Sequence, residues 1–204
     1  MTQIAIFASG SGSNAENIAD YFKGNPDIGV ALILSNKQDA YVHERAKKLG
    51  IASFFFTKVE FDEGTKILDV LRKYEIDFIV LAGFLLKISQ PILDAFSGRI
   101  INIHPALLPK YGGKGMYGDK VHQAVIDAGE TESGITIHYV NEHYDAGHII
   151  YQVSCEVQTG DSCDILAARV HALEYAHFPR VIEDVVKELY MRGDIPSNEK
   201  GRTG

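Results

Sequence analysis

Three side chains in the second half of the sequence have types and a spacing suited to acyl transfer. Asn102 and His104 lie two residues apart in RIINIHP, and Asp145 follows in NEHYDAGHII. On a strand, residues i and i+2 share a face, so Asn102 and His104 point the same way while the isoleucines beside them point to the opposite side. Pro105 removes the next backbone N–H donor and ends the strand there.

These three residue types together can stabilise a tetrahedral oxyanion and move a proton. An amide and an imidazole donate hydrogen bonds to the oxyanion, and a carboxylate beside the imidazole holds its tautomer and raises its pKa. A plain structural interpretation stays open for each. Asn102 and His104 can satisfy nearby loop carbonyls, and an Asp before Ala-Gly is often a turn residue.

A glycine-rich turn in the first half, FASGSGSNAENI, has the character of an anion-binding loop. Glycine and serine allow a ligand to approach the backbone, and the free N–H groups at a helix start favour an anion. The spacing also fits the dinucleotide fingerprint G-x-G-x-x-A, but the acid expected at the end of the second strand is missing, and SNK stands there. A phosphate monoester therefore fits better than NAD. NADP beside Lys37, and a plain capped turn, remain as alternatives.

Histidine and cysteine spacing predicts no metal site. His138, His143 and His148 are spaced by five, which matches neither one helix face nor the H-E-x-x-H pattern. Cys155 and Cys163 form no C-x-x-C pair, so they suggest neither a zinc ribbon nor a disulfide framework.

The composition describes an ordinary globular chain. Its 204 residues suffice for one domain, 46% are hydrophobic and 23% are charged. The net charge of −7 argues against nucleic acid as a general partner. The N-terminus lacks the marks of a secretory signal, and no apolar run approaches the roughly 20 residues of a membrane helix, so we expect no membrane partner and a cytoplasmic location.

The first half must position these residues through alternating strands and helices. Continuous apolar runs predict strands of a parallel sheet covered on both faces, at 3–9, 29–35, 51–56, 77–83 and 99–104. Helical spacing appears at 14–24, 39–50 and 61–74, with Gly24 and Gly50 expected to end the first two helices. The series predicts an α/β fold, a single doubly wound Rossmann-like domain. Glu44, Arg45, Lys47 and Lys48 are expected on a solvated helix face.

The second half of the sequence predicts antiparallel strands in place of parallel ones. A helix at 119–129 is followed by two strands, 134–141 and 148–157, joined by a tight turn, which predicts an antiparallel C-terminal portion. A long helix from about 162 to 190 begins at Asp161 or Ser162. We expect one domain over 1–191 and a polar tail over 192–204.

In this order, the motifs resemble the phosphoribosylglycinamide formyltransferases of purine synthesis. The resemblance covers nearly the whole chain through SGSGSNAENI, LSNKQDAYVHERAKKLGI, VLAGFLLKIS, GRIINIHPALLPKYGG, SGITIHYVNEHYDAGHIIYQ and GDSCDILAARVHALEYAHFP. It implies transfer of a formyl group from 10-formyltetrahydrofolate, as co-substrate, to the amine of 5′-phosphoribosylglycinamide. The resemblance also implies that the partners are small molecules and that no metal is bound. It implies a monomer or a homodimer.

The resemblance also assigns roles to residues. It makes Asn102, His104 and Asp145 catalytic, and it gives Gly12, Ser13 and Asn14 to the substrate phosphate. His171 and Glu174, on one helix face, take the ribose and glycinamide. The implied folate-binding residues are Leu85, Leu86, Lys87, Ile88, Asn102, Asn141, Glu142, His143, Tyr144 and Asp145.

The sequence departs from the family on the folate side. Leu86 stands where many relatives have an arginine. The FDEGTK segment also has no arginine, although some relatives offer one to the folate there. Two other functions stay open. One is formyl transfer to another amine, such as a nucleotide sugar, and the other is a non-catalytic NADP-binding module built on Gly10–Ala15.

Overall fold

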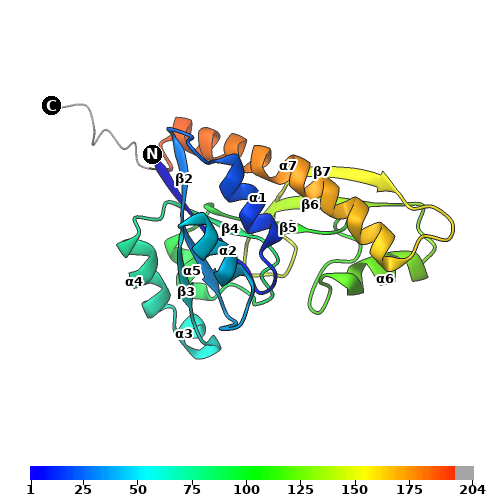
Figure 1. Ribbon diagram of the computed structural model, residues 1–204, viewed down its shortest axis with the longest axis horizontal. Helices are drawn as coiled ribbons and strands as arrows, with labels where there is room; N and C mark the ends of the chain where they lie inside the picture. The colour runs from blue at the N-terminus through cyan, green and yellow to red at the C-terminus, as the bar shows by residue number, and fades with distance from the viewer. Residues whose placement is uncertain (196–204) are drawn as a thin grey trace.

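Seven strands form one sheet in the computed structural model, which describes residues 1–195 (Figure 1). They are β1 (Thr2–Phe7), β2 (Ile28–Ser35), β3 (Ala52–Phe55), β4 (Phe78–Leu81), β5 (Ile100–His104), β6 (Glu132–Tyr139) and β7 (Ile149–Glu156). Their order is β3-β2-β1-β4-β5-β6-β7. The first five strands pair in parallel, whereas β6 and β7 are antiparallel. The predicted mostly parallel sheet with an antiparallel C-terminal portion is confirmed.

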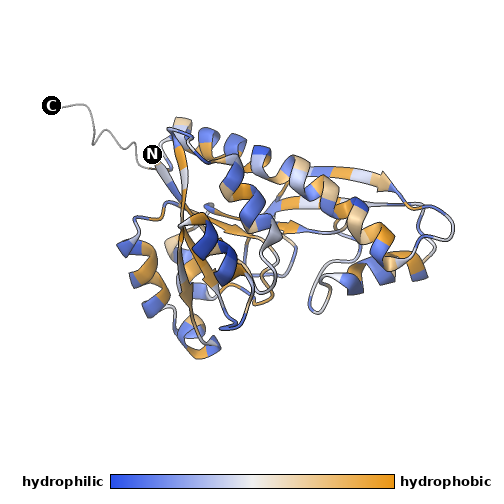
Figure 2. Cartoon of the chain, in the orientation of Figure 1, coloured by the Kyte–Doolittle hydropathy of each residue, from blue (hydrophilic) through white to orange (hydrophobic). Residues whose placement is uncertain are grey.

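Seven helices accompany this sheet within the described residues, and they cover both of its faces. They are α1 (Ser13–Tyr21), α2 (Val42–Leu49), α3 (Lys58–Glu63), α4 (Thr65–Lys73), α5 (Gln90–Ala95), α6 (Asp119–Asp127) and α7 (Cys163–Arg192). One apolar core lies between the sheet and α1, α2, α6 and α7, and a second lies under α3, α4 and α5. In Figure 2 the strands between the helices are mostly hydrophobic, and α2 turns a hydrophilic side outward.

The third predicted helix is two helices. The segment expected over 61–74 is divided at Gly64, whose φ of 76° is a left-handed conformation that ends α3. Thr57 and Glu60 form a capping box at the start of α3, four residues before the predicted start. Helix α1 ends at Tyr21, before Gly24, while Gly50 caps α2 as expected.

The last helix closes the first core. Ser162 caps α7 by accepting a hydrogen bond from the backbone N–H of Ile165, and the helix continues past an internal Pro179. Ile195, three residues after the helix, is buried in the same core as β1. The remaining residues of the predicted tail, 196–204, lie outside the described residues.

The sheet order creates a crevice beside β1. The strand has β2 on one side and β4 on the other, so the connections after β1 and β4 run in opposite directions. Ligands of open α/β sheets bind at this kind of switch point, outside the carboxyl ends of the strands. The loop Gly10–Asn14 follows β1, Gly83 follows β4, and His104 ends β5.

Candidate active site

The three predicted catalytic residues meet at the end of β5. Asn102 and His104 share a face of this strand, and Asp145 reaches them from the β6–β7 connection. Asp145 Oδ2 lies 3.7 Å from His104 Nδ1 and accepts a hydrogen bond of 2.8 Å from the backbone N–H of Gly113. A strand and two loops therefore converge on one carboxylate.

His104 is buried between two oxygen acceptors. Its Nε2 lies 2.7 Å from the carbonyl oxygen of Tyr111, which only accepts, so we place a proton on Nε2. Asp145 on the Nδ1 side and the Tyr111 carbonyl both favour the imidazolium. Burial opposes it more strongly, so the net effect is to lower the pKa of His104. The raised pKa expected from the neighbouring carboxylate is therefore not found.

His138 is part of the site, although sequence spacing considered it only as a metal ligand. It pairs with Asn102 across β5 and β6, and its Nε2 lies 3.1 Å from Asn102 Nδ2. Its Nδ1 lies 2.8 Å from the Tyr139 carbonyl, so the proton belongs on Nδ1 and Nε2 accepts from Asn102. His138 Nε2 is also 3.6 Å from Asp145 Oδ1. The ring thus fixes the direction in which the Asn102 amide points.

The connection that carries Asp145 is tightly folded. Asp145 has a φ of 51°, and a Cβ at Gly147 would lie 1.6 Å from the Tyr139 carbonyl oxygen, so only glycine fits there. Burial raises the pKa of Asp145, but the neighbouring His138 ring and the hydrogen bond from the Gly113 N–H outweigh it and hold this pKa below its ordinary value. Asp145 is therefore ionised at neutral pH.

The glycine-rich loop leads directly into α1. Gly12 is its N-cap residue with a φ of 74°, and Ser13 and Asn14 form the first turn. A Cβ on Gly12 would lie 2.3 Å from Val42 Cγ2 of α2, so the absence of this atom lets α2 pack against the loop. Within residues 1–195, no acceptor is bonded to the N–H groups of Gly12, Ser13 and Asn14. These donors are available to an anion.

Asn14 and Glu174 join α1 to α7 beside this loop. Asn14 Nδ2 donates to Glu174 Oε2 over 2.8 Å, and Asn14 Oδ1 is buried with no hydrogen-bond partner within the described part of the chain. Glu174 is 5% exposed, and burial raises its pKa although Asn14 and His171 act in the opposite direction. His171 lines the same cleft and contacts the ring of His122 edge to face.

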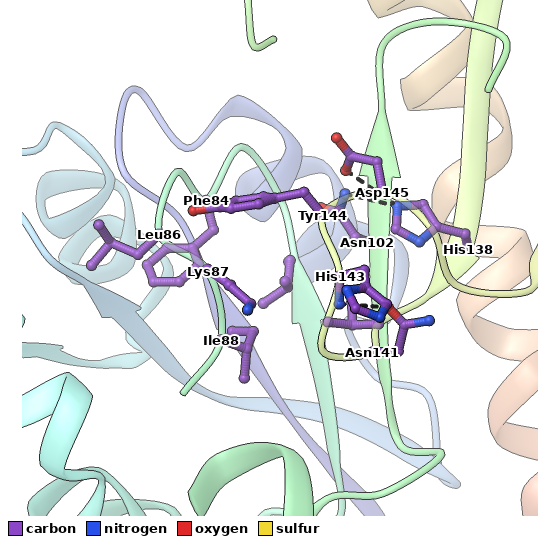
Figure 3. Close-up of a pocket in the computed structure, with 12 residues that line it drawn as sticks. Phe84, Leu86, Lys87, Ile88, Asn102, His138, Asn141, His143, Tyr144 and Asp145 are labelled. Carbon is purple, nitrogen blue, oxygen red and sulfur yellow. Dashed lines mark hydrogen bonds and ion pairs between the residues drawn. The ribbon is translucent and has the colours of Figure 1, made fainter. Parts of the chain in front are cut away.

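A smaller pocket lies on the other side of Asn102. In Figure 3 the segments 84–88 and 141–145 face each other across it. Of the predicted folate-binding residues, Leu85 lines the larger cleft, and Glu142 lines neither cavity. The others line the smaller pocket, which is bounded by Leu81, Phe84, Leu86, Lys87, Ile88, Asn102, His138, Val140, Asn141, His143, Tyr144 and Asp145.

The larger cleft, of about 590 Å³, contains the phosphate loop, His104, His171 and Glu174. The glycine-rich segment 113–118 and His122 also line it, and sequence reasoning assigned neither to the site. The two cavities share four residues, Phe84, Asn102, Tyr144 and Asp145. A ligand in each cavity would therefore meet at the predicted catalytic group.

A model of the formyl transferase family matches residues 2–182. The chain belongs to this family. Phosphoribosylglycinamide formyltransferase from Bacillus subtilis is 40% identical over 193 residues, which are 91% of this chain and 95% of that protein. The chloroplastic enzyme of the same name from Arabidopsis thaliana is 41% identical over 91% of this chain, but the chain spans only 66% of its length. The crystal structure of the Streptococcus pneumoniae enzyme superposes with a TM-score of 0.81 at 37% identity, covering 91% of this chain and 99% of that one.

Family membership agrees with the resemblance predicted from the sequence. Within residues 1–195 of this formyl transferase, no group of three or more His, Cys, Asp or Glu residues is placed to hold a metal ion. No helix in the same part of the chain is both long enough and apolar enough to cross a membrane.

Proposed function

We propose that the chain transfers the formyl group of 10-formyltetrahydrofolate to the amine of 5′-phosphoribosylglycinamide. The observation that carries the proposal is the pair of cavities meeting at Asn102 and Asp145. The larger one offers backbone N–H donors for a phosphate and a buried carboxylate for an amine. The smaller one, between two loops with apolar side chains, suits a flat heterocycle.

The ribonucleotide fits polar groups that have spare hydrogen-bonding capacity within residues 1–195. Its phosphate lies at the start of α1, where the N–H groups and the helix dipole favour negative charge. Its amine donates to Glu174 and to the buried Asn14 Oδ1, which accepts no hydrogen bond within residues 1–195. This placement puts the amine in the same cleft as Asn102, His104 and Asp145.

The reaction follows from the groups at that junction. The amine nitrogen attacks the formyl carbon, the formyl oxygen becomes an oxyanion, and the bond from the formyl carbon to the folate nitrogen then breaks. Asn102 Nδ2 donates a hydrogen bond to the oxyanion. His104 donates from Nδ1 when the ring carries a second proton there, while its Nε2–H stays on the Tyr111 carbonyl, and the Asp145 carboxylate 3.7 Å from Nδ1 stabilises this charged imidazole against the effect of burial. A water held by Asp145 carries the proton from the attacking amine to the folate nitrogen as it leaves.

A direct assay tests the proposal. Purified protein is given 10-formyltetrahydrofolate and 5′-phosphoribosylglycinamide, and the formylated product is measured by mass spectrometry. We expect turnover that depends on both substrates. Parallel reactions replace the ribonucleotide by an amino sugar linked to a nucleotide, and a titration tests NADP binding. Turnover with the nucleotide sugar alone, or NADP binding without turnover, contradicts the proposal.

Two further expectations accompany this proposal. We expect the protein in the cytoplasm, although the Arabidopsis relative is named as chloroplastic. We also expect a monomer or homodimer, which sedimentation of the purified protein decides.

A further inference from the structure

Arg45 of α2 does not lie on a solvated face as its sequence neighbourhood predicts. Glu44, Lys47 and Lys48 are exposed as expected, but the Arg45 side chain is only 22% exposed. It points back to the turn that follows β1. The prediction is therefore wrong for this one residue of the four.

Three contacts hold the Arg45 side chain. Its Nε donates to the backbone carbonyl of Ser11 over 2.9 Å, and its Nη1 forms an ion pair with Glu16 of α1. The guanidinium carbon lies 5.1 Å from the centre of the Tyr41 ring. A planar guanidinium presents several donors in fixed directions, so it can bond a carbonyl and a carboxylate at the same time.

Two further contacts hold the neighbouring carbonyls of the same loop. The backbone N–H of Val42 donates to the Gly10 carbonyl over 3.2 Å, and the N–H of Glu16 donates to the Gly12 carbonyl over 2.9 Å. Three consecutive carbonyls, those of residues 10, 11 and 12, are therefore bonded to groups of α1 and α2.

Because the peptide units are planar and trans, the bonded carbonyls also fix the direction of the backbone N–H groups in this loop. In each peptide unit the C=O and the following N–H point in opposite directions. Carbonyls held by α1 and α2 therefore direct the N–H groups of Ser11, Gly12 and Ser13 away from those partners. All three residues line the larger cleft, so these N–H groups can converge on one anion there.

We propose that Arg45 is a positioning residue for the phosphate end of the site. The inference rests on the phosphate-binding part of the proposed function, because it assumes that the loop binds the substrate phosphate. Arg45 acts by fixing the Ser11 carbonyl, and thereby the Gly12 N–H. Its role is orientation rather than attraction, since the ion pair with Glu16 neutralises its charge.

A kinetic comparison separates positioning from a general structural role. We expect Arg45→Met to raise KM for the ribonucleotide about tenfold, the scale of one lost charge-assisted hydrogen bond, and to leave kcat and the KM of the formyl donor within about twofold. The same substrate without its phosphate should react equally well with both proteins. Arg45→Lys, which keeps a donor, should recover part of the loss. Equal losses for the phosphorylated and unphosphorylated substrates, or no loss, overturn the inference.

Arg72→Met is the matched control. Arg72 also pairs with an acid, Asp69, but it lies on α4 under the opposite face of the sheet. Its replacement should change neither KM. Thermal unfolding of all variants shows whether each one is folded at the assay temperature.

Binding of inorganic phosphate tests the inference without the reaction. The backbone N–H signals of Gly12 and Ser13 are followed by NMR during a phosphate titration. We expect saturable shifts in the wild type and binding about tenfold weaker in Arg45→Met. Phosphate binding without turnover would refute the proposed function and leave this inference standing. Equal phosphate binding by both proteins, or no binding at this loop in the wild type, overturns the inference about Arg45.

Discussion

The two ends of the active-site cleft are built in different ways. At the ribonucleotide end, the donors are backbone N–H groups at the start of α1, and the nearby Glu174 is 5% exposed between α1 and α7. At the formyl-donor end, side chains from two connections form the walls. Tyr144, one of these side chains, is 41% exposed.

This difference predicts how much change each end tolerates. Backbone donors are fixed by the packing of whole helices, so a new Cβ or a lost carbonyl bond moves them all together. Loop side chains can change without refolding the loop. Leu86, where the sequence leads us to expect a departure from the family, lines the smaller pocket at the donor end. Substitutions should therefore cost most at the junction, then at the ribonucleotide end, and least at the donor end.

The largest effect is expected at the junction itself. His104→Ala removes an oxyanion donor, and it should lower kcat by about 10²–10³. The groups proposed to bind the phosphate and the folate stay in place, so the affinities for both substrates should change only a few-fold. Stopped-flow turnover and calorimetric titration of each substrate measure the two quantities. Near-normal turnover would remove His104 from the catalytic group.

Gly12→Val tests the ribonucleotide end. The new side chain meets Val42 and the residue must hold a φ of 74°, so α2 or the loop has to shift. We expect KM for the ribonucleotide to rise by about 10- to 100-fold, the cost of losing one or two charge-assisted hydrogen bonds, with donor affinity almost unchanged. The effect arises through α2, because the new side chain meets Val42 at the start of that helix.

Gly24→Val is the matched control for that variant. Gly24 has nearly the same φ, 77°, but its Cβ position has no atom within 4 Å. It should reproduce the backbone strain and leave the ribonucleotide KM unchanged. If donor affinity falls in Gly12→Val while ribonucleotide affinity holds, the two ends have been assigned in reverse.

Glu174 should give the ribonucleotide end its own pH dependence. Burial raises its pKa above the ordinary 4.5, so kcat/KM for the ribonucleotide should fall on acidification at a pH above that value. Glu174→Gln should lower kcat/KM about tenfold at neutral pH, as for one charged hydrogen bond, and remove this acidic limb. A limb that persists in the variant belongs to another group.

The stability of the fold should depend on the protonation of Glu174 in the opposite sense to kcat/KM. The folded protein holds the Glu174 proton more tightly than the unfolded chain, so this contribution is present below pH 4.5 and is lost as pH rises through the raised pKa. Glu174→Gln should therefore raise the unfolding temperature at pH 7 and give no gain at pH 4. Calorimetry at the two pH values measures the difference.

The smallest effect is expected for Lys87 at the donor end. It lines the smaller pocket and a neighbouring cavity that also contains Lys58, and it is exposed. Lys87→Met should raise the KM of the formyl donor about two- to threefold, because exposed charges contribute little and are screened by salt. The ribonucleotide KM should not change. An unchanged donor KM at low ionic strength would show that Lys87 takes no part in binding.

The sheet was predictable because burial on both faces leaves a continuous apolar pattern. Most residues of β1 and β2 and all of β4 are apolar, and each strand was expected within two residues of its bounds. The short α5 was not predicted, since six residues cannot display a helical period. The division of 61–74 depends on the backbone conformation of Gly64, which composition does not determine.

The site was predictable where one element carries it. Asn102 and His104 share a strand face, and the phosphate loop is continuous in sequence. His138 was missed because its role arises from pairing β6 with β5, and spacing within one segment contains no trace of that contact. Arg45 was misplaced for the same reason, since its partner Ser11 lies 34 positions away.

The contact between α1 and α7 has a consequence for how the chain is made. Asn14 meets Glu174 across 160 positions of sequence, and Tyr21 reaches Glu183 across 162. A ribosome releases the N-terminal strands and α1 long before it has synthesised the helix that covers them. Until then one apolar face of the nascent sheet is open to water and to chaperones, and the ribonucleotide end lacks His171 and Glu174. Chains interrupted before α7 should be cleared as aggregates or protease substrates.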